Sequence, residues 1–336
     1  MSLSTNELPL LEVKNVFKRF PLDEKLIGKP TQFVYAVYGV SLRLARGKTV
    51  GLVGESGCGK STVGKLICKL DEPNEGEIIY KGENISKFSS REELNYHQAV
   101  QMIFQNPYTS LNPRQRIGRI LREIFRVHQL CGMEEVEERI GAALEAVGLD
   151  AESYHKYPFE FSGGQRQRVS IARSLAVNPE IIVCDEPVSA LDVSIQAQIL
   201  KLLKELQKEH HLAYLFISHD LSVVYHICDE VLIMYMGMIM ERGPVEKIFN
   251  NPSHPYTQAL LSAIPIPYPN AKKERIILKG EIPSPTRLPK GCPFYSRCKR
   301  RMDICREEFP PVEELSAEHE VFCWLYSKNG IKSNGK

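Results

Sequence analysis

The sequence of 336 residues lacks several features that define large classes of proteins. It has no excess of charge of one sign, because 43 Lys and Arg face 41 Asp and Glu, so charge gives no general argument for nucleic acid or an acidic membrane surface as partner. Its longest apolar run, 231–240, has ten residues interrupted by Gly237. A membrane helix needs about 20, so this run is more typical of a buried hairpin. Internal repeats and low-complexity tracts are also missing.

The first residues have no basic segment followed by an apolar one, so the sequence predicts a protein that stays in the cytosol. Nine cysteines in that compartment are expected to be reduced thiols or metal ligands. The length predicts one major domain with an appendage.

A glycine-rich segment, Gly-Glu-Ser-Gly-Cys-Gly-Lys-Ser-Thr at 54–62, follows an apolar strand predicted over 49–53. We call this segment the phosphate loop, because it fits the pattern of Gly, four residues, and Gly-Lys-Ser/Thr. Backbone N–H groups of such a loop surround a β-phosphate at the start of a helix. Lys60 is expected to reach the β- and γ-phosphates, Ser61 to ligate Mg²⁺ and Thr62 to contact the α-phosphate. The residues predicted to bind nucleotide here are Gly54, Glu55, Ser56, Gly57, Cys58, Gly59, Lys60, Ser61 and Thr62.

Hydrophobic periodicity predicts an α/β fold. Strands are predicted over 10–17, 36–44, 77–80, 99–104, 181–184 and 212–217, the first two belonging to a β-rich subdomain. Strands that alternate with helices imply a mainly parallel sheet. Residues 107–161 are predicted to form a helical insert, with one buried stripe at Ile117, Ile120, Leu121 and Ile124 and another at Val136, Ile140, Leu144 and Val147.

The composition changes beyond about residue 265. Nine of the 21 prolines lie between 265 and 311, and four of the nine cysteines lie in the last 45 residues. The sequence therefore predicts a nucleotide-binding domain over 1–265, with its helical subdomain at about 107–161, and a separate Pro/Cys-rich domain over 266–336. We expect this tail not to continue the α/β core and to need its own source of stability.

Two acids, Asp185 and Glu186, come directly after the strand at 181–184. Ligands bind at this edge of an open parallel sheet. Alone, the two acids fit a catalytic role and a plain strand end equally well, and the phosphate loop in the same chain favours the catalytic role. Asp185 is suited to holding Mg²⁺, and Glu186 to orienting and polarising an attacking water. A second anion site is predicted where Ser162, Gly163, Gly164 and Gln165 open a helix with Ser162 as N-cap.

Together these segments resemble the motifs of the ATP-binding cassette (ABC) ATPases. The phosphate loop is similar to Walker A, 162–165 to the signature motif, Asp185-Glu186 to Walker B, and Ser218-His219-Asp220 to the switch-histidine segment, in the family's order. The resemblance implies a P-loop NTPase of ABC type, with a mainly parallel sheet, an antiparallel β subdomain and a helical subdomain.

The resemblance also implies roles for single residues. Two ATPase domains would dimerise head to tail, so that 162–165 of one chain close over the γ-phosphate held by the partner. His219 would bond that γ-phosphate. Gln105 would touch Mg²⁺ or the attacking water and report to a membrane partner. An aromatic residue would stack on adenine, with Phe20 and Tyr35 as the two candidates.

Three longer segments resemble the ATPase subunits of bacterial oligopeptide and dipeptide importers: 105–113, 185–198 and His254-Pro-Tyr-Thr257. These importers have two different ATPase subunits, and Pro187-Val-Ser-Ala190 resembles the F-type one. The resemblance implies an ATPase that drives peptide import from the inner face of the cell membrane. It would act with two transmembrane permeases, an external peptide-binding protein, and either a companion ATPase or a second copy of itself, without nucleic acid. The identity of the transported solute is not encoded here.

The tail cysteines Cys292, Cys298, Cys305 and Cys323 have five, six and seventeen residues between them. Structural zinc sites use closer pairs, which are missing, whereas four thiolates on a Pro-rich loop suit an iron-sulfur cluster. Zinc, or no metal, stays open from the residues alone. The importer resemblance also implies a 4Fe-4S cluster, with a structural or a redox role. The other cysteines, Cys58, Cys68, Cys131, Cys184 and Cys228, have no partner at ligand spacing and are expected to be structural.

Two other functions fit the sequence less well. A cassette ATPase acting on nucleic acid or ribosomes usually carries a long coiled coil or a second ATPase domain, and this chain has neither, nor a basic aromatic patch. A regulatory module that binds ATP without hydrolysing it would not need Asp185, Glu186 and His219 together.

Overall fold

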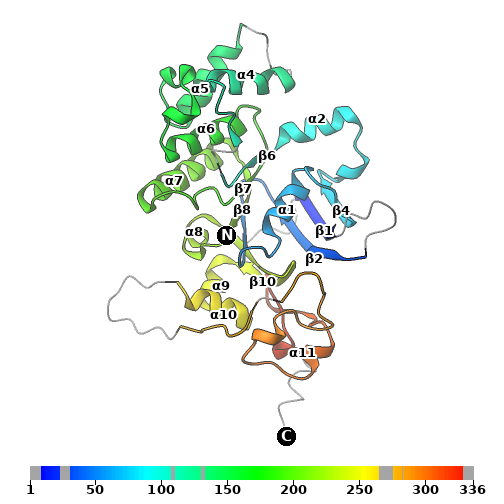
Figure 1. The fold of residues 1–336 in the computed structure, drawn as a ribbon. Coiled ribbons are helices and arrows are strands. Elements are labelled where there is room, and N and C mark those ends of the chain that lie inside the picture. Colours follow the sequence, from blue (N-terminus) through cyan, green and yellow to red (C-terminus); the bar gives the residue numbers. More distant parts are fainter. Residues whose placement is uncertain are drawn as a thin grey trace.

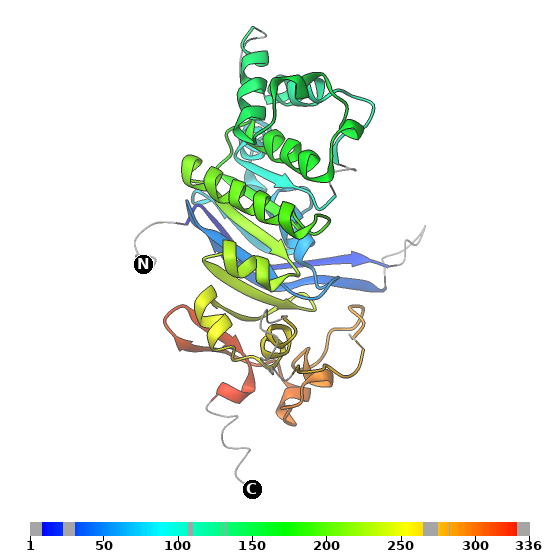
Figure 2. The ribbon, with the colours of Figure 1, turned by 90° about the vertical axis from the view of Figure 1, so that its left-hand side faces the viewer.

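The computed structural model describes residues 9–22, 31–106, 110–128, 130, 132, 134–264, 275–281 and 283–327. The predictions for Cys131, for part of the segment 105–113 and for part of the tail fall outside these residues. In Figures 1 and 2 two sheets occupy the middle of the molecule, with a helical arm at one end and the tail at the other. No helix among the described residues combines the length and apolarity needed to cross a membrane.

Among the described residues the larger sheet has eight strands, and it is parallel at its centre. Its order is β11 (Val312–Ser316), β12 (His319–Phe322), β10 (Met238–Pro244), β9 (Glu230–Tyr235), β3 (Thr49–Val53), β8 (Ala213–Ser218), β7 (Ile181–Asp185) and β6 (Val100–Ile103). Strand β3 pairs in parallel with β8 and β9, and β7 with β6 and β8. Strands β3, β7 and β8 are buried along their whole length, as expected for parallel strands covered on both faces.

The smaller sheet is antiparallel and has the order β2-β1-β4-β5. Its strands are β1 (Leu11–Pro21), β2 (Phe33–Leu44), β4 (Glu75–Tyr80) and β5 (Glu83–Asn84). The predicted β-rich subdomain is therefore confirmed, and so is the hairpin at 231–240, formed by β9 and β10.

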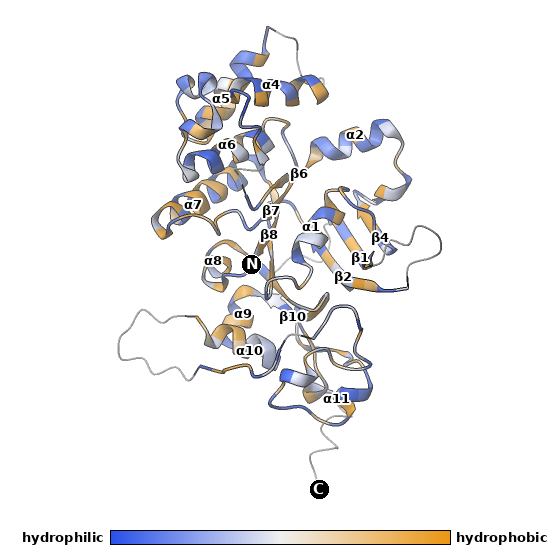
Figure 3. Ribbon diagram, in the orientation of Figure 1, coloured by the Kyte–Doolittle hydropathy of each residue, from blue (hydrophilic) through white to orange (hydrophobic). Residues whose placement is uncertain are grey.

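The helices cover the sheets and build the arm. They are α1 (Lys60–Ile67), α2 (Ser90–Ala99), α4 (Ile117–His128), α5 (Val136–Ala146), α6 (Gly163–Leu175), α7 (Val193–His210), α8 (Leu221–Ile227), α9 (Val245–Asn250), α10 (Pro255–Ser262) and α11 (Ile304–Glu307). Single 3₁₀ turns occur at Ile85–Lys87, Ala151–His155, Pro158–Glu160, Tyr295–Arg297 and Trp324–Tyr326. Figure 3 shows hydrophobic residues along the central strands and polar residues over the outer helices α2 and α5. Both predicted stripes of the helical insert face inward, with Ile124 alone partly exposed among the first four.

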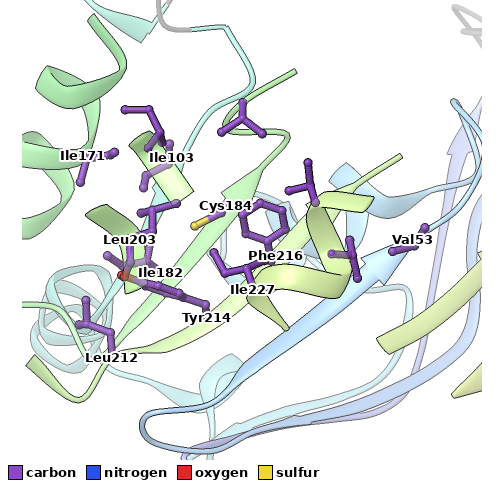
Figure 4. Packing of buried hydrophobic residues seen from close by; sticks show 14 of the residues in the cluster. Val53, Ile103, Ile171, Ile182, Cys184, Leu203, Leu212, Tyr214, Phe216 and Ile227 are labelled. Atoms are coloured by element: carbon purple, nitrogen blue, oxygen red, sulfur yellow. The ribbon is translucent and has the colours of Figure 1, made fainter. Parts of the chain in front are cut away.

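Alternating side chains of the central strands divide the core into two clusters. Ile182 and Cys184 of β7 pack with Tyr214 and Phe216 of β8 on the side of α6 to α8, as Figure 4 shows. The residues between them, such as Val183, face the side of α1 and the smaller sheet. The period of two therefore fixes which helices each strand contacts.

The prediction that the tail does not continue the α/β core is wrong for its last described part. Strand β12 pairs with β10, through Glu241 opposite Val321, and so adds the β11-β12 hairpin to the larger sheet. Cys292, Phe294 and Trp324 also belong to the hydrophobic cluster of α6 to α8. The physical reason is that β10 offers an unpaired edge, which a short hairpin from the tail satisfies. The division of the chain into two domains at residue 265 remains a prediction.

A buried carboxylate joins this hairpin to the core. Glu241 is 0% exposed and accepts hydrogen bonds from the backbone N–H of Ser253 (2.8 Å) and His254 (2.9 Å), and it contacts His319 Nε2 at 2.8 Å. A single side chain therefore links β10, the start of α10 and β12.

We expect Glu241→Gln to lower the free energy of unfolding by about 3 kcal/mol, because the amide group turns a donor towards groups that need an acceptor. Urea denaturation of the purified protein measures this change. The matched control is Glu209→Gln at an exposed position of α7, which should stay within about 0.5 kcal/mol of the unmodified protein. A Glu241 variant as stable as the control would show that the buried carboxylate does not stabilise the junction.

Candidate active site

The phosphate loop lies between β3 and α1, as predicted. Neighbouring strands approach the loop so closely that two of its glycines have no room for a side chain. A Cβ on Gly54 would lie 2.1 Å from the carbonyl oxygen of Met234, and one on Gly59 would lie 2.0 Å from that of Ala36. Gly57 has open space around it but a φ of +78°, which side chains rarely adopt. The loop is thus held between β2 and β9, and its shape follows from this close approach.

Lys60 is the first residue of α1 and is only 5% exposed. Its ammonium group donates to the carbonyl oxygens of Gly54 at 2.8 Å and Glu55 at 3.0 Å. The lysine therefore closes the loop on its first two residues. Its charge lies beside the loop's backbone, where an anion would be bound.

The two predicted Mg²⁺ ligands are in contact. Ser61 Oγ donates to Asp185 Oδ1 at 2.9 Å, across 124 positions of sequence. Burial raises the pKa of Asp185, and the bond from Ser61 opposes that rise. Mg²⁺ is commonly held by one or two carboxylates, with phosphates and water completing the shell. This pair of oxygen ligands fits such an ion.

Glu186 contacts two other predicted catalytic residues, Gln105 and His219. Its carboxylate accepts a hydrogen bond from Gln105 Nε2 at 2.9 Å and contacts His219 Nδ1 at 3.2 Å, with 13% of the side chain exposed. Its φ is +47°, a strained conformation for a residue with a long side chain. The backbone N–H of Glu186 donates to Ile217 O at 3.0 Å, which ties the turn to β8. The end of β7 thus places one carboxylate between two polar side chains.

The second predicted anion site opens α6. Ser162 Oγ accepts from the Gln165 N–H at 3.3 Å, and Gln165 Oε1 accepts from the Ser162 N–H at 3.0 Å, which makes a capping box. A Cβ on Gly164 would lie 2.6 Å from Ile195 of α7, so this glycine permits close packing of the two helices. In the described part of the chain these side-chain bonds close the turn on itself, and none reaches the phosphate loop.

The two aromatic candidates occupy different surroundings. Phe20 is 37% exposed near the end of β1, with Lys18 Nζ 5.0 Å from its ring centroid. Tyr35 lines a crevice of about 40 Å³ beside the phosphate loop, and its N–H donates to Pro285 O at 3.0 Å. Only Tyr35 contacts the loop's surroundings in this way, but which ring stacks on adenine stays a prediction.

Sequence reasoning missed two contacts to the phosphate loop. Arg297 of the tail binds the carboxylate of Glu55 through two nitrogens, at 2.7 and 3.1 Å. The Tyr256 hydroxyl accepts from the Glu55 N–H at 3.0 Å. Both partners are far from Glu55 in sequence. Tyr256 lies in the segment 254–257 that resembles the importers, but that resemblance indicates no contact with the loop, and no motif includes Arg297.

The thiols of the four tail cysteines are close enough to influence one another. Cys292, Cys305 and Cys323 are buried, Cys298 is half-buried, and the Cys292 N–H donates to Cys305 O at 2.8 Å. Burial raises the pKa of Cys292 and of Cys323 to about 12, and the neighbouring thiols add to both shifts. Among the described residues no group of three or more His, Cys, Asp or Glu side chains is arranged to hold a metal ion. The predicted iron-sulfur cluster domain is therefore not shown.

The remaining described cysteines are unpaired thiols. Cys58, Cys68 and Cys184 are buried and Cys228 is half-buried. Burial raises the pKa of each of these thiols above its usual value.

Comparison with known proteins agrees with this geometry. Residues 37–189 match the family model "ABC transporter", and residues 240–305 match "Oligopeptide/dipeptide transporter, C-terminal region". Among solved structures, cbiO1 of Clostridium perfringens, part of the ABC transporter complex cbiONQ, has a TM-score of 0.63 at 25% identity, covering 73% of this chain and 92% of that one. A dimeric ATP-binding cassette in a post-hydrolysis state, bound to ADP and Pi, has a TM-score of 0.61 at 28% identity, covering 70% and 98%. Fold and site therefore define an ABC-type ATPase.

Two curated relatives narrow the class. The oligopeptide transport ATP-binding protein AppF of Bacillus subtilis is 49% identical over 96% of this chain and 99% of its own length. The dipeptide transport ATP-binding protein DppF of Haemophilus influenzae is 50% identical over 95% and 99%. The chain belongs to this family of peptide-transport ATP-binding proteins, as the resemblance in its sequence predicted.

Proposed function

We propose that the protein is the ATP-hydrolysing, energy-coupling subunit of an importer for dipeptides or oligopeptides. The observation that carries this proposal is the contact of Gln105 and His219 with Glu186, next to the Ser61–Asp185 pair, in a chain whose 240–305 match the peptide-transporter region. The protein would work on the inner face of the cell membrane with two transmembrane permeases. An external peptide-binding protein would deliver the solute.

Each residue of the site would have its own role in ATP hydrolysis. Lys60 binds the β- and γ-phosphates, and Ser61, Asp185 and Gln105 would hold Mg²⁺. When bound, that ion neutralises charge on the phosphates. Glu186 orients the attacking water and accepts its hydrogen bond, while His219 bonds the γ-phosphate. Positioning and electrostatics supply most of the rate in such reactions.

Residues 162–165 complete the site of a second copy. The capping box occupies the N–H groups of Ser162 and Gln165, whereas those of Gly163 and Gly164 in the first turn of α6 have no intrahelical acceptor and would face an anion from outside the chain. ATP would therefore hold two such domains together, and hydrolysis would release them. The partner is either a companion ATPase or a second copy of this chain.

The test of this function is purification of the tagged protein from its native membranes in mild detergent, followed by mass spectrometry. Two permeases and a second ATPase, or a stoichiometry of two copies, support the proposal and identify the dimer. Recovery with ribosomes or DNA from the soluble fraction would contradict the transport assignment and leave the ATPase chemistry intact. ATP binding without hydrolysis would favour the regulatory module instead.

We also propose that Cys292, Cys298, Cys305 and Cys323 bind a 4Fe-4S cluster, and that 266–336 is the part of the chain it stabilises. The burial of Cys292, Cys305 and Cys323 and the backbone hydrogen bond between Cys292 and Cys305 support the proposal. A Cβ on Gly291 would lie 2.5 Å from Cys305 O, so glycine at this position permits that approach. The sequence spacing of the four cysteines lacks the close pairs that structural zinc sites use, which favours a cluster over zinc. Its role is structural stabilisation or redox sensing.

Anaerobic purification is expected to give brown protein with about four iron and four sulfide per chain. Cys298→Ala should lose most of both, because one of the four ligands is gone, whereas Cys228→Ala in the core should keep them. Iron and acid-labile sulfide assays measure the content. Colourless protein with stoichiometric zinc would exclude the cluster.

A further inference from the structure

The tail contacts the phosphate loop through a two-point ion pair. Arg297 Nη1 lies 2.7 Å from Glu55 Oε2, and Nη2 lies 3.1 Å from Glu55 Oε1. The Arg297 side chain is 8% exposed and that of Glu55 is 23% exposed. A planar guanidinium that meets a carboxylate with two parallel bonds fixes orientation as well as distance. Partial burial shields this pair from the solvent screening that weakens surface ion pairs.

Neighbouring groups hold the arginine in place. The Tyr235 hydroxyl is 3.4 Å from Arg297 Nη1, and the guanidinium carbon is 5.8 Å from the Tyr235 ring centroid. The rings of Tyr235, Tyr256 and Phe294 lie 4.8 to 5.4 Å apart. This aromatic cluster spans β9, α10 and the tail, so the arginine projects from a packed base.

Glu55 is also the residue on which Lys60 closes the loop. The Glu55 carbonyl accepts from Lys60 Nζ, its N–H donates to the Tyr256 hydroxyl, and its carboxylate binds Arg297. The backbone and side chain of one residue therefore connect the phosphate-binding lysine to the tail. Any displacement of the Arg297 guanidinium acts on the first turn of the loop.

The backbone of the tail adds a second contact near the loop. Pro283 and Pro285 line the crevice beside Glu55, and Pro285 O accepts from the N–H of Tyr35 on β2. Arg297 itself ends a 3₁₀ turn and directly precedes Cys298, whose N–H donates to Tyr295 O at 3.3 Å. The conformation of the cysteine segment thus sets where the guanidinium lies.

We propose that Arg297 is a positioning residue for nucleotide binding: through Glu55 the tail braces the phosphate loop, so the order of the cysteine segment and the affinity for ATP are linked. The inference rests on the proposed ATPase function and adds a coupling between two parts of the chain. Linkage is reciprocal, so bound nucleotide also orders the tail.

The test is a double-mutant cycle read by nucleotide affinity. Arg297→Met and Glu55→Gln should each raise the Kd for a non-hydrolysable ATP analogue by about 5- to 50-fold, and the double variant should be no weaker than the weaker single. The KM for ATP should rise likewise, while kcat at saturating ATP changes less. Arg300→Ala, an exposed arginine three positions away, should leave the Kd unchanged.

A second readout separates positioning from loss of fold. Hydrogen exchange of residues 292–305 should slow when the analogue binds to the unmodified protein, and this response should disappear in Glu55→Gln, a change at the loop that leaves the tail sequence intact. Unchanged Kd in both single variants, or independent losses that multiply in the double variant, would overturn the proposal. Normal affinity in all variants overturns only the brace, whereas an unmodified protein that neither binds nor hydrolyses ATP overturns the proposed function.

Discussion

Glu186→Gln is expected to bind ATP with near-normal affinity and to hydrolyse it about 10²- to 10⁴-fold more slowly than the unmodified protein. The amide keeps the size of the side chain but cannot act as a carboxylate acceptor for the attacking water. Gln105 and His219 would still surround it, so the site keeps its shape while losing its base. Phosphate release at saturating ATP measures turnover, and size-exclusion chromatography with ATP should show dimers that accumulate because the nucleotide persists.

The matched control is Glu209→Gln, the same change at an exposed position of α7, which should retain full turnover. If Glu186→Gln hydrolysed ATP at an undiminished rate, the water would have to be activated by another group. Slow turnover together with weak ATP binding would instead indicate that the substitution had disturbed the phosphate loop. The loss of turnover could then not be assigned to the chemical step alone.

Lys60→Met is expected to fail at the earlier step. The substitution removes the charge that meets the β- and γ-phosphates, and it leaves the carbonyls of Gly54 and Glu55 without their donor. We expect binding of ATP to fall steeply and hydrolysis to drop by about 10²- to 10³-fold. Isothermal titration with a non-hydrolysable analogue measures the binding.

Lys65→Met provides the control, because Lys65 is exposed one turn further along the same helix. It should bind and hydrolyse ATP normally. A Lys60 variant that bound the analogue as tightly as this control would contradict the assigned role. Together with Glu186→Gln, which keeps binding and loses turnover, the two variants separate affinity from chemistry.

The sequence predicted the sheets well because their patterns are local. The apolar runs that became β3, β7 and β8 are short, continuous and bounded by turn residues, which is typical of buried parallel strands. The phosphate loop and the acids after β7 were placed correctly at the carboxyl edge of the sheet for the same reason. The prediction of a peptide-transport family rested on longer sequence segments, and the two curated relatives confirm it.

The tail was misjudged because its pairing is not local. Residues 312–316 are mostly exposed and lack a clear alternation, and β12 pairs with β10, a strand far from it in sequence. The residues of the Arg297–Glu55 pair are 242 positions apart. The phosphate-loop pattern includes Glu55 but gives no indication of its partner. The φ of +47° at Glu186 could not be predicted either, because no local sequence pattern indicates a strained glutamate.

The place of β12 beside β10 bears on how the tail should be studied. A chain cut at residue 265 would expose the N–H and C=O groups along one side of β10, next to apolar residues such as Met238 and Ile239 that are buried in the intact molecule. Open edges of this kind recruit other chains. Such a shortened protein would tend to aggregate, and any loss of activity would report that self-association. Single side-chain changes in the full-length chain are therefore the sound way to separate the tail from the ATPase.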